Sequence, residues 1–325
     1  MLALTSAYLA APAAGENGKE LPWDGRGHGL TVKTITDKYL THILTMRNGG
    51  NSGNVSDYVS IDQKGRIPGY NKDTGVINIA VDAKAIFKEQ YNFRRSELVQ
   101  IIVGNTKGTT FFRASVQKVE AFYNKFTWQM FFDEAAMFNV RIDASTSPAK
   151  INYVNGGTWD SKWSTNFITG TWYNFGIAVS ASETGKGSRL DFYASTGNDD
   201  LVLKTTHHVL TTLPSLYELH IGLLTLTDDG SQPIMNPNRD ILMFNGVSAD
   251  KRVVLTANAK EDAAVGSLEK LTCARDRSNS HWRCPCSLPP SFSIQQDLVN
   301  ICQGSLRHYQ NLVTHRGEKD IDRNC

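Results

Sequence analysis

The chain has 325 residues, of which 40% are hydrophobic and 20% charged, and its formal net charge is +2. Such a composition is ordinary for a globular protein with a sizeable core. The sequence lacks the clustered Lys and Arg of nucleic-acid-binding domains, and no apolar run reaches the roughly 18 residues of a membrane span. We therefore expect neither a nucleic-acid nor a membrane partner.

The first 20 residues are mostly small and apolar, and Ala11-Pro12-Ala13 fits an Ala-x-Ala cleavage pattern. The basic region that precedes a strong signal peptide is missing. We interpret residues 1–20 as a weak secretion signal, with a simple N-terminal tail as the alternative, and expect a secreted, extracellular protein.

The central part of the chain alternates short segments rich in β-branched and aromatic residues with clusters of turn-forming residues. Strands are predicted at 76–81, 98–103, 109–119, 126–142, 151–154, 172–180, 190–194, 201–205, 217–226, 241–244 and 253–256. Only residues 83–90 favour a helix. Many short strands separated by turns are typical of an antiparallel sandwich or barrel. The pattern predicts an all-β fold, a β-jelly-roll sandwich, over residues 21–257.

Residues 258–325 differ in character, because they contain all five cysteines and no regular period. These are Cys273, Cys284, Cys286, Cys302 and Cys325. An odd number leaves at least one thiol unpaired in a monomer. His281 with Cys284 and Cys286 is a poor match to zinc-ligand spacing. We expect an irregular C-terminal extension, and neither a metal nor an organic cofactor.

The first candidate site segment is Arg94-Arg95-Ser96-Glu97-Leu98. Alternate residues of a strand share a face, so Arg95 and Glu97 point the same way. An arginine beside a carboxylate lowers the pKa of that carboxylate, which suits a nucleophile or a base. The alternative is a solvent-facing ion pair.

The second segment runs from Trp128 to Glu134. Strict alternation places Glu134 on the same face as Trp128, Met130 and Phe132. A carboxylate on the aromatic side of a strand suits a sugar site. Alternatively, Glu134 simply ends the strand at its solvent edge.

The third segment contains His220, with Gly222 two residues later on the same face. The small glycine predicts room for a ligand to approach the imidazole, although a lone strand histidine is often a core residue. The adjacent pair His207-His208 has no neighbouring motif and is interpreted as surface.

Two carboxylates and a histidine on facing strands of a concave sheet are suited to glycoside hydrolysis, in which one group protonates the leaving oxygen and another activates water or attacks the sugar. If the pair inverts the anomeric centre, its carboxyl groups should lie about 6.5–9.5 Å apart.

Several segments together resemble glycoside hydrolase family 131 over about residues 21–257. The similar segments are Trp23-Asp24-Gly25-Arg26, Arg94-Arg95-Ser96-Glu97-Leu98, Gln129-Met130-Phe131-Phe132-Asp133-Glu134, Trp163-Ser164-Thr165-Asn166-Phe167, Trp172-Tyr173-Asn174-Phe175, Ser195-Thr196-Gly197-Asn198-Asp199-Asp200-Leu201 and His220-Ile221-Gly222-Leu223-Leu224-Thr225-Leu226. The resemblance implies a β-jelly roll with an open substrate cleft, and a fungal or oomycete enzyme that hydrolyses β-glucans with β-1,3, β-1,6 and β-1,4 linkages by inversion. It implies that Glu97, Glu134 and His220 are the catalytic residues.

The chain departs from the family pattern beside two of these segments. Ala135-Ala136-Met137 stands where Ser-His-Phe is usual, and Thr225 replaces an arginine. Both changes are expected to remove polar groups near the cleft. We favour an active, monomeric β-glucanase, with a non-catalytic glucan-binding relative as an alternative.

Substrate contacts are expected from Arg95 and from three aromatic residues around a glycine-rich loop, namely Tyr153, Trp159 and Trp163. The rival function is a polysaccharide lyase of the alginate-lyase type, because Arg95-Ser96-Glu97-Leu98 also resembles the Arg-[Ser/Thr]-Glu-Leu strand of those enzymes. The Tyr-Phe-Lys-x-Gly-x-Tyr strand of such lyases is not found here.

Overall fold

The computed structural model describes residues 18–47, 49–50, 53–155, 160–227, 229–257, 274–275 and 282–283. Internal contacts divide the chain into two units, Met1–Glu261 and Asp262–Cys325. Within the second unit, β15 (Ala274–Arg275) pairs antiparallel with β16 (Trp282–Arg283). The predicted signal up to residue 17, Trp159 and all five cysteines lie outside the described residues.

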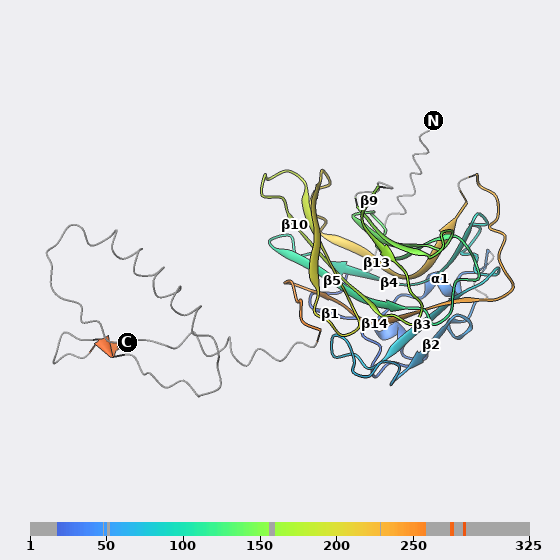
Figure 1. Ribbon diagram of the computed structural model, residues 1–325, viewed down its shortest axis with the longest axis horizontal. Helices are drawn as coiled ribbons and strands as arrows, with labels where there is room; N and C mark the ends of the chain where they lie inside the picture. The colour runs from blue at the N-terminus through green and yellow to red at the C-terminus, as the bar shows by residue number, and fades with distance from the viewer. Residues whose placement is uncertain are drawn as a thin grey trace. The chain divides into compact units, whose positions relative to one another are not determined.

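The first unit contains two antiparallel sheets (Figure 1). The larger sheet has eight strands. In spatial order they are β12 (Val202–Val209), β11 (Ser188–Thr196), β10 (Tyr173–Ala181), β5 (Thr109–Gln117), β14 (Asp240–Asp250), β3 (Val76–Val81) and β2 (Val59–Asp62), with β1 (Trp23–Asp24) pairing with β14.

The smaller sheet has six strands. Their order is β4 (Phe93–Val103), β13 (Leu216–Leu226), β6 (Thr127–Asp133), β7 (Phe138–Asp143), β8 (Lys150–Asn155) and β9 (Ser161–Asn166). Strands β4 and β13 are far apart in sequence but pair along their whole length, from Phe93 opposite Leu226 to Val103 opposite Leu216.

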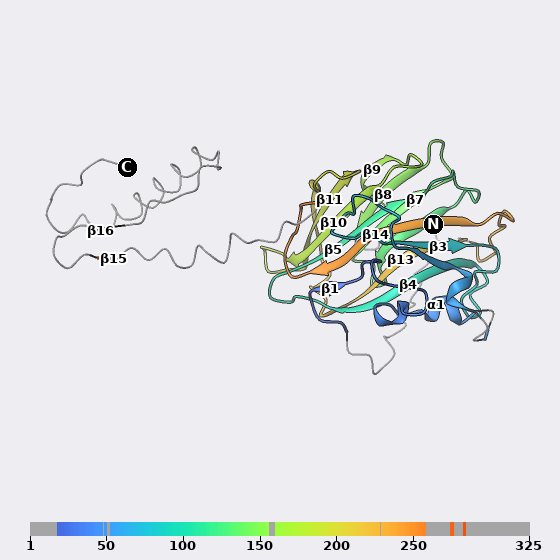
Figure 2. The same cartoon turned by 90° about the horizontal axis from the view of Figure 1, so that it is seen from below.

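Helical structure in the described residues is limited to three short segments before β3. These are η1 (Ile35–Asp37), α1 (His42–Thr45) and η2 (Val55–Asp57). Helix α1 lies beside β4 (Figures 1 and 2). Its Ile43 packs with Val99 of β4 and with Phe87, and so covers part of that strand.

The main core forms between the inner faces of the two sheets, where apolar side chains from alternate strand positions meet. Phe112 of the larger sheet contacts Phe138 and Tyr217 of the smaller one, with ring centroids 5.2 and 5.0 Å apart. Tyr153 of β8 stacks on Phe192 of β11 at 4.0 Å. These contacts fix which face of each strand points inward, and hence which residues point outward.

The predicted fold class is confirmed, since the first unit is an antiparallel β-sandwich of the jelly-roll type with almost no helix. The helix expected at residues 83–90 is wrong. Asp82 binds the backbone N–H groups of Lys84 and Ala85 instead, and this closes a turn rather than starting a helix. Residues 253–256 form no strand, whereas the polar β9 and the short β2 were missed.

The long strand expected at residues 126–142 is two strands, β6 and β7, joined by a tight hairpin. Ala136 in this connection has φ 59°, a left-handed conformation that reverses the chain direction. The hairpin matters for the site because Glu134 lies at its start.

No helix among the described residues is long and apolar enough to cross a membrane.

Candidate active site

The candidate site lies on the outer face of the six-stranded sheet. On β13, Leu219 and Ile221 point into the core, so Glu218 and His220 point outward. On β4, Leu98 belongs to the core, and Glu97 therefore faces the same side as His220. Strand pairing places Gly222 opposite Glu97 and brings the two segments together.

A bulge in β6 places Glu134 on the same face of the sheet as Glu97 and His220. The register between β6 and β7 shifts between Gln129 and Phe131, and Met130 and Phe131 both enter the core. Phe132 points outward and stacks on His220, with ring centroids 4.7 Å apart and an interplanar angle of 17°. Glu134 thus shares a face with Phe132 but not with Trp128 and Met130, contrary to the strict alternation expected from sequence.

Glu97 makes the ion pair with Arg95 that the sequence predicted. Arg95 donates from Nε to Oε1 at 2.8 Å and from its terminal nitrogen to Oε2 at 2.6 Å. Both residues are buried, and the Glu97 side chain is 0% exposed. Because both carboxylate oxygens are bound and sealed from solvent, Glu97 has no free surface to offer a substrate.

His220 connects Glu97 to the exposed part of the site. Its Nδ1 lies 2.6 Å from Glu97 Oε2. An ionised carboxylate only accepts hydrogen bonds, so Nδ1 carries the proton and donates. The opposite nitrogen, Nε2, lies 3.6 Å from Glu134 Oε2 and 3.3 Å from Glu218 Oε1. Neither contact is a well-aligned hydrogen bond, which leaves Nε2 a buried donor available to another acceptor.

The charges of this cluster support one another. Burial alone would raise the pKa of Glu97, but the Arg95 charge and the hydrogen bond from His220 outweigh burial and lower it to about 2. Burial alone would lower the pKa of His220, but its contacts with Glu218 and Glu97 raise it to about 9. His220 is therefore an imidazolium at neutral pH.

The pKa values of the two outer carboxyl groups, Glu134 and Glu218, are shifted in opposite directions. Burial of part of the side chain raises the pKa of Glu134 above 4.5. The contact with His220 lowers the pKa of Glu218 below 4.5. Two carboxyl groups whose surroundings separate their pKa values are the usual arrangement for an acid and a base.

Gly222 has a different purpose from the one inferred from sequence. A Cβ at this position would lie 2.2 Å from Ser96 O and 2.7 Å from Glu97 Cα. Its φ of 153° is also one that other residues rarely adopt. The glycine therefore lets β13 approach β4 closely at Glu97, and does not hold open a space for a ligand.

Asp133 supports the site from the inner side of the sheet. Its Oδ1 accepts the backbone N–H of Glu218 at 3.1 Å, and Glu134 N donates to the carbonyl of Glu218 at 3.0 Å. Asp133 is buried, and burial raises its pKa to about 7. These bonds hold the backbones of Glu134 and Glu218 side by side.

The residues expected to bind substrate are not gathered at this cluster. Tyr153 is fully buried, stacks on Phe192 and contacts His207 Nε2 through its hydroxyl at 3.1 Å. This burial leaves no ring face of Tyr153 for a sugar, and it also places His207 partly inside rather than on the surface. Trp163 is half-buried against Phe192. Arg95 is bound to Glu97, and Trp159 lies outside the described residues.

The residues that depart from the family pattern do not all lie where we expected them from the sequence, at the cleft. Thr225 is buried and shares the inward-facing side of β13 with Leu223, so it does not line the outer face. Met137 is a core residue. Ala135 is exposed beside Glu134 and Ala136 is partly exposed, so of the four changed residues only these two are open to solvent.

Sequence reasoning missed Glu218 and the stacking role of Phe132. The signal for Glu218 was present, because it lies two residues before His220 and strand alternation puts both on one face. Phe132 could not be paired with His220 without knowing that β6 lies next to β13.

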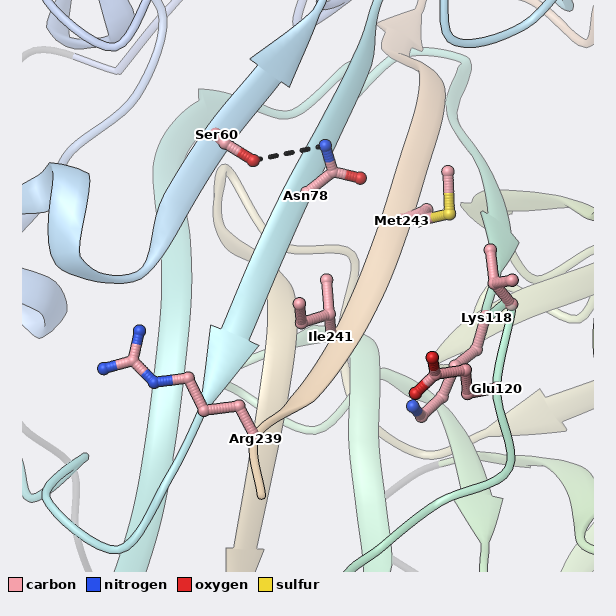
Figure 3. A pocket seen from close by; sticks show the side chains of 8 residues that line it. Ser60, Asn78, Lys118, Glu120, Arg239, Ile241 and Met243 are labelled. Atoms are coloured by element: carbon pink, nitrogen blue, oxygen red, sulfur yellow. Dashed lines mark hydrogen bonds between the residues drawn. The ribbon is translucent and has the colours of Figure 1, made fainter. Parts of the chain in front are cut away.

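A hollow of about 310 Å³ lies on the outer face of the larger sheet, apart from the His220 cluster (Figure 3). Asn78, Ile241 and Met243 line it, and they alternate with core residues of β3 and β14. Its cationic groups are already paired, Lys118 with Asp240 at 3.3 Å and Arg239 with Asp82 at 2.8 Å. This hollow faces away from the His220 cluster and adds nothing to it.

Within the described part of the chain, no group of His, Cys, Asp and Glu side chains is arranged to hold a metal ion.

Comparison with known proteins identifies the family. Residues 21–254 match the model of the glycoside hydrolase 131 catalytic N-terminal domain. No curated protein matches the chain at a significant level.

Two solved structures share the fold. The catalytic domain of the glycoside hydrolase family 131 protein from Coprinopsis cinerea is 21% identical with a TM-score of 0.57, and the match covers 76% of this chain and 100% of that one. A GH131 β-glucanase catalytic domain from Podospora anserina is 20% identical with a TM-score of 0.57, covering 72% of this chain and 97% of that one.

The family match spans the sandwich and every residue of the His220 cluster, and the chain therefore belongs to glycoside hydrolase family 131, with a glycosidase catalytic domain over residues 21–254.

Proposed function

We propose that this chain is a secreted, monomeric β-glucanase that hydrolyses β-1,3, β-1,6 and β-1,4 linkages. The observation that carries the proposal is the position of His220 between one buried and two partly exposed carboxyl groups. The similar catalytic domain from Podospora anserina is a β-glucanase, which supports the substrate class.

Glu134 is the general acid in this proposal. Its side chain is 37% exposed, so it can reach a bound sugar, and partial burial raises its pKa, which favours the protonated form that a general acid needs. That proton goes to the glycosidic oxygen as the C1–O bond breaks. The nearby imidazolium then stabilises the carboxylate that remains.

In this proposal, Glu97 and His220 position the groups around the general acid Glu134. Glu97, held ionised by Arg95, keeps His220 charged and fixes the ring through Nδ1. Phe132 fixes the ring plane by stacking on it. Nε2 is thereby directed toward Glu134, where it can donate a hydrogen bond to the acid or to a sugar hydroxyl.

The mechanism is expected to invert the anomeric centre, with water attacking on the face opposite the leaving group. Glu97 and Glu134 contact opposite ring nitrogens of His220. The imidazole thus occupies the space between these two carboxyl groups, so the attacking water must be placed elsewhere.

The test is incubation of the purified full chain with laminarin, pustulan and carboxymethylcellulose, with the products sized by chromatography. We expect reducing sugar and no ultraviolet-absorbing unsaturated product. Glu134→Gln should lower kcat by about 10²–10⁴-fold, since general acid catalysis contributes that much. Unsaturated products would indicate a lyase, and binding without release of sugar would indicate a non-catalytic relative; either result overturns the proposal.

A further inference from the structure

Two carboxyl groups of the cluster are open to solvent, and they are not the pair expected from sequence. The Glu134 and Glu218 side chains are 37% and 25% exposed, whereas that of Glu97 is 0% exposed. Hydrolysis requires one carboxyl group to reach the leaving oxygen and another to reach water. In this site, only Glu134 and Glu218 meet that requirement.

Both groups contact the same atom. Glu134 Oε2 and Glu218 Oε1 lie 3.6 and 3.3 Å from Nε2 of His220, so the carboxyl groups flank one nitrogen. Their two oxygens are therefore no more than about 7 Å apart, close enough for both carboxyl groups to act on one glycosidic bond.

The backbone fixes this arrangement. Asp133, the residue before Glu134, accepts the N–H of Glu218, while the N–H of Glu134 donates to the carbonyl of Glu218. The end of β6 and the start of β13 thus present their carboxylates from adjacent, mutually bonded positions.

We propose that Glu218 is the general base of this enzyme, a catalytic residue that takes the proton of the attacking water while Glu134 protonates the leaving oxygen. The proposal rests on glucan hydrolysis as proposed above. It makes Glu97 a positioning residue, which acts on the reaction only through His220.

The step balances without any further reagent. Glu134 gives its carboxyl proton to the glycosidic oxygen, and the C1–O bond to the leaving sugar breaks. The water oxygen bonds to C1, and the water proton passes to the Glu218 carboxylate. After product release, Glu218 loses this proton and Glu134 regains one through solvent or through the exchangeable Nε2–H of His220, so the enzyme returns to its starting state.

The surrounding charges favour this division of roles. The contact with His220, and after it the charge of Arg95, lowers the pKa of Glu218 and favours its ionised form. Burial, together with the negative groups Glu97 and Glu218, raises the pKa of Glu134 and outweighs the lowering by His220 and Arg95.

The test compares wild type with Glu218→Gln, which keeps shape and removes the base. Glu183→Gln is the matched control, because Glu183 is a surface residue with a 79% exposed side chain. We expect kcat to fall by about 10²–10⁴-fold in E218Q with KM changed only a few-fold, and no change in E183Q. The acidic limb of the pH profile of kcat/KM should disappear in E218Q.

An activated substrate separates the acid from the base. A dinitrophenyl β-glucoside needs little protonation of its leaving group, so E134Q should regain much of its rate on this substrate while E218Q remains slow. Formate should partly restore Glu218→Ala, because a small carboxylate can enter the vacated space, and a structural role of Glu218 would give no such rescue.

The outcomes separate this proposal from the one on which it rests. Wild type inactive on every glucan would overturn the β-glucanase assignment, and this proposal with it. Active wild type with fully active E218Q, or an E218Q variant that recovers on the dinitrophenyl substrate, would overturn the role of Glu218 alone.

Discussion

His220 Nδ1 and Glu97 Oε2 lie 2.6 Å apart in a part of the sandwich that solvent does not reach, with side-chain exposures of 1% and 0%. Arg95 completes a buried row of alternating charge. Such a row is stable only while every member keeps its partner, since a buried unpaired charge is strongly unfavourable. The other nitrogen of the same imidazole, Nε2, contacts the exposed carboxyl groups of Glu134 and Glu218. His220 therefore contributes to both stability and the proposed catalysis.

Replacing Glu97 with Gln should therefore weaken folding as well as catalysis. The neutral amide leaves Arg95 and His220 buried without their anion, at a cost of about 3–5 kcal/mol in the free energy of unfolding. Urea denaturation at neutral pH measures this loss, with E183Q as the surface control. Unchanged stability would show that the buried ion pairs contribute nothing net.

Stability should depend on pH on both sides of neutrality. The pKa of Glu97 falls from 4.5 to about 2, so its contribution is present above pH 4.5 and is lost as pH drops toward 2. The pKa of His220 rises from 6.5 to about 9, so its contribution is full below pH 6.5 and is lost as pH rises toward 9. The charged groups that face the ring are Arg95, Glu97, Glu134 and Glu218, and α1 adds the titratable His42, whose pKa burial lowers.

A denaturation series from pH 3 to pH 9.5 on wild type and E97Q tests this expectation. The wild-type free energy of unfolding should decline at both ends of the series. In E97Q the acidic decline should be smaller, because its main source is absent. An acidic decline of equal size in both proteins would contradict the assignment to Glu97.

Gly222→Ala should displace β13 from β4. The new Cβ would lie 2.2 Å from Ser96 O, and the residue would be held at φ 153°. We expect a loss of at least about 1–3 kcal/mol from backbone strain, together with reduced kcat because Glu97 must move.

Gly50→Ala is the matched control for this change, because its Cβ would approach no atom closer than 3.9 Å. Thermal melting and laminarin hydrolysis of both variants measure the difference. Equal behaviour of G222A and G50A would show that the close approach at Glu97 is unimportant.

Tyr153→Phe should leave glucan hydrolysis unchanged, because the ring is buried between the sheets and does not face the His220 cluster. Removing the hydroxyl loses its contact with His207, at a cost of about 1 kcal/mol in stability. Kinetics on laminarin and a thermal melt check both parts. A large rise in KM in Y153F would restore Tyr153 as a sugar-binding residue.

The sequence by itself predicted much of the fold and part of the site. Strand alternation is local, so the β-rich pattern identified the all-β class, and the two-residue spacing of Arg95 and Glu97 predicted their ion pair. The same rule places Glu218 beside His220. These inferences succeeded because they need only neighbouring residues.

Other features depend on strands that are distant in sequence. The bulge in β6 turns Phe132 toward His220, and only the pairing of β6 with both β7 and β13 reveals it. Glu97 is buried by its contacts with Arg95 and with His220 of β13, and Tyr153 is buried by the larger sheet. Alternation along one strand tells which residues share a face, but the solvent exposure of that face is set by the tertiary packing of segments that lie far away in the chain.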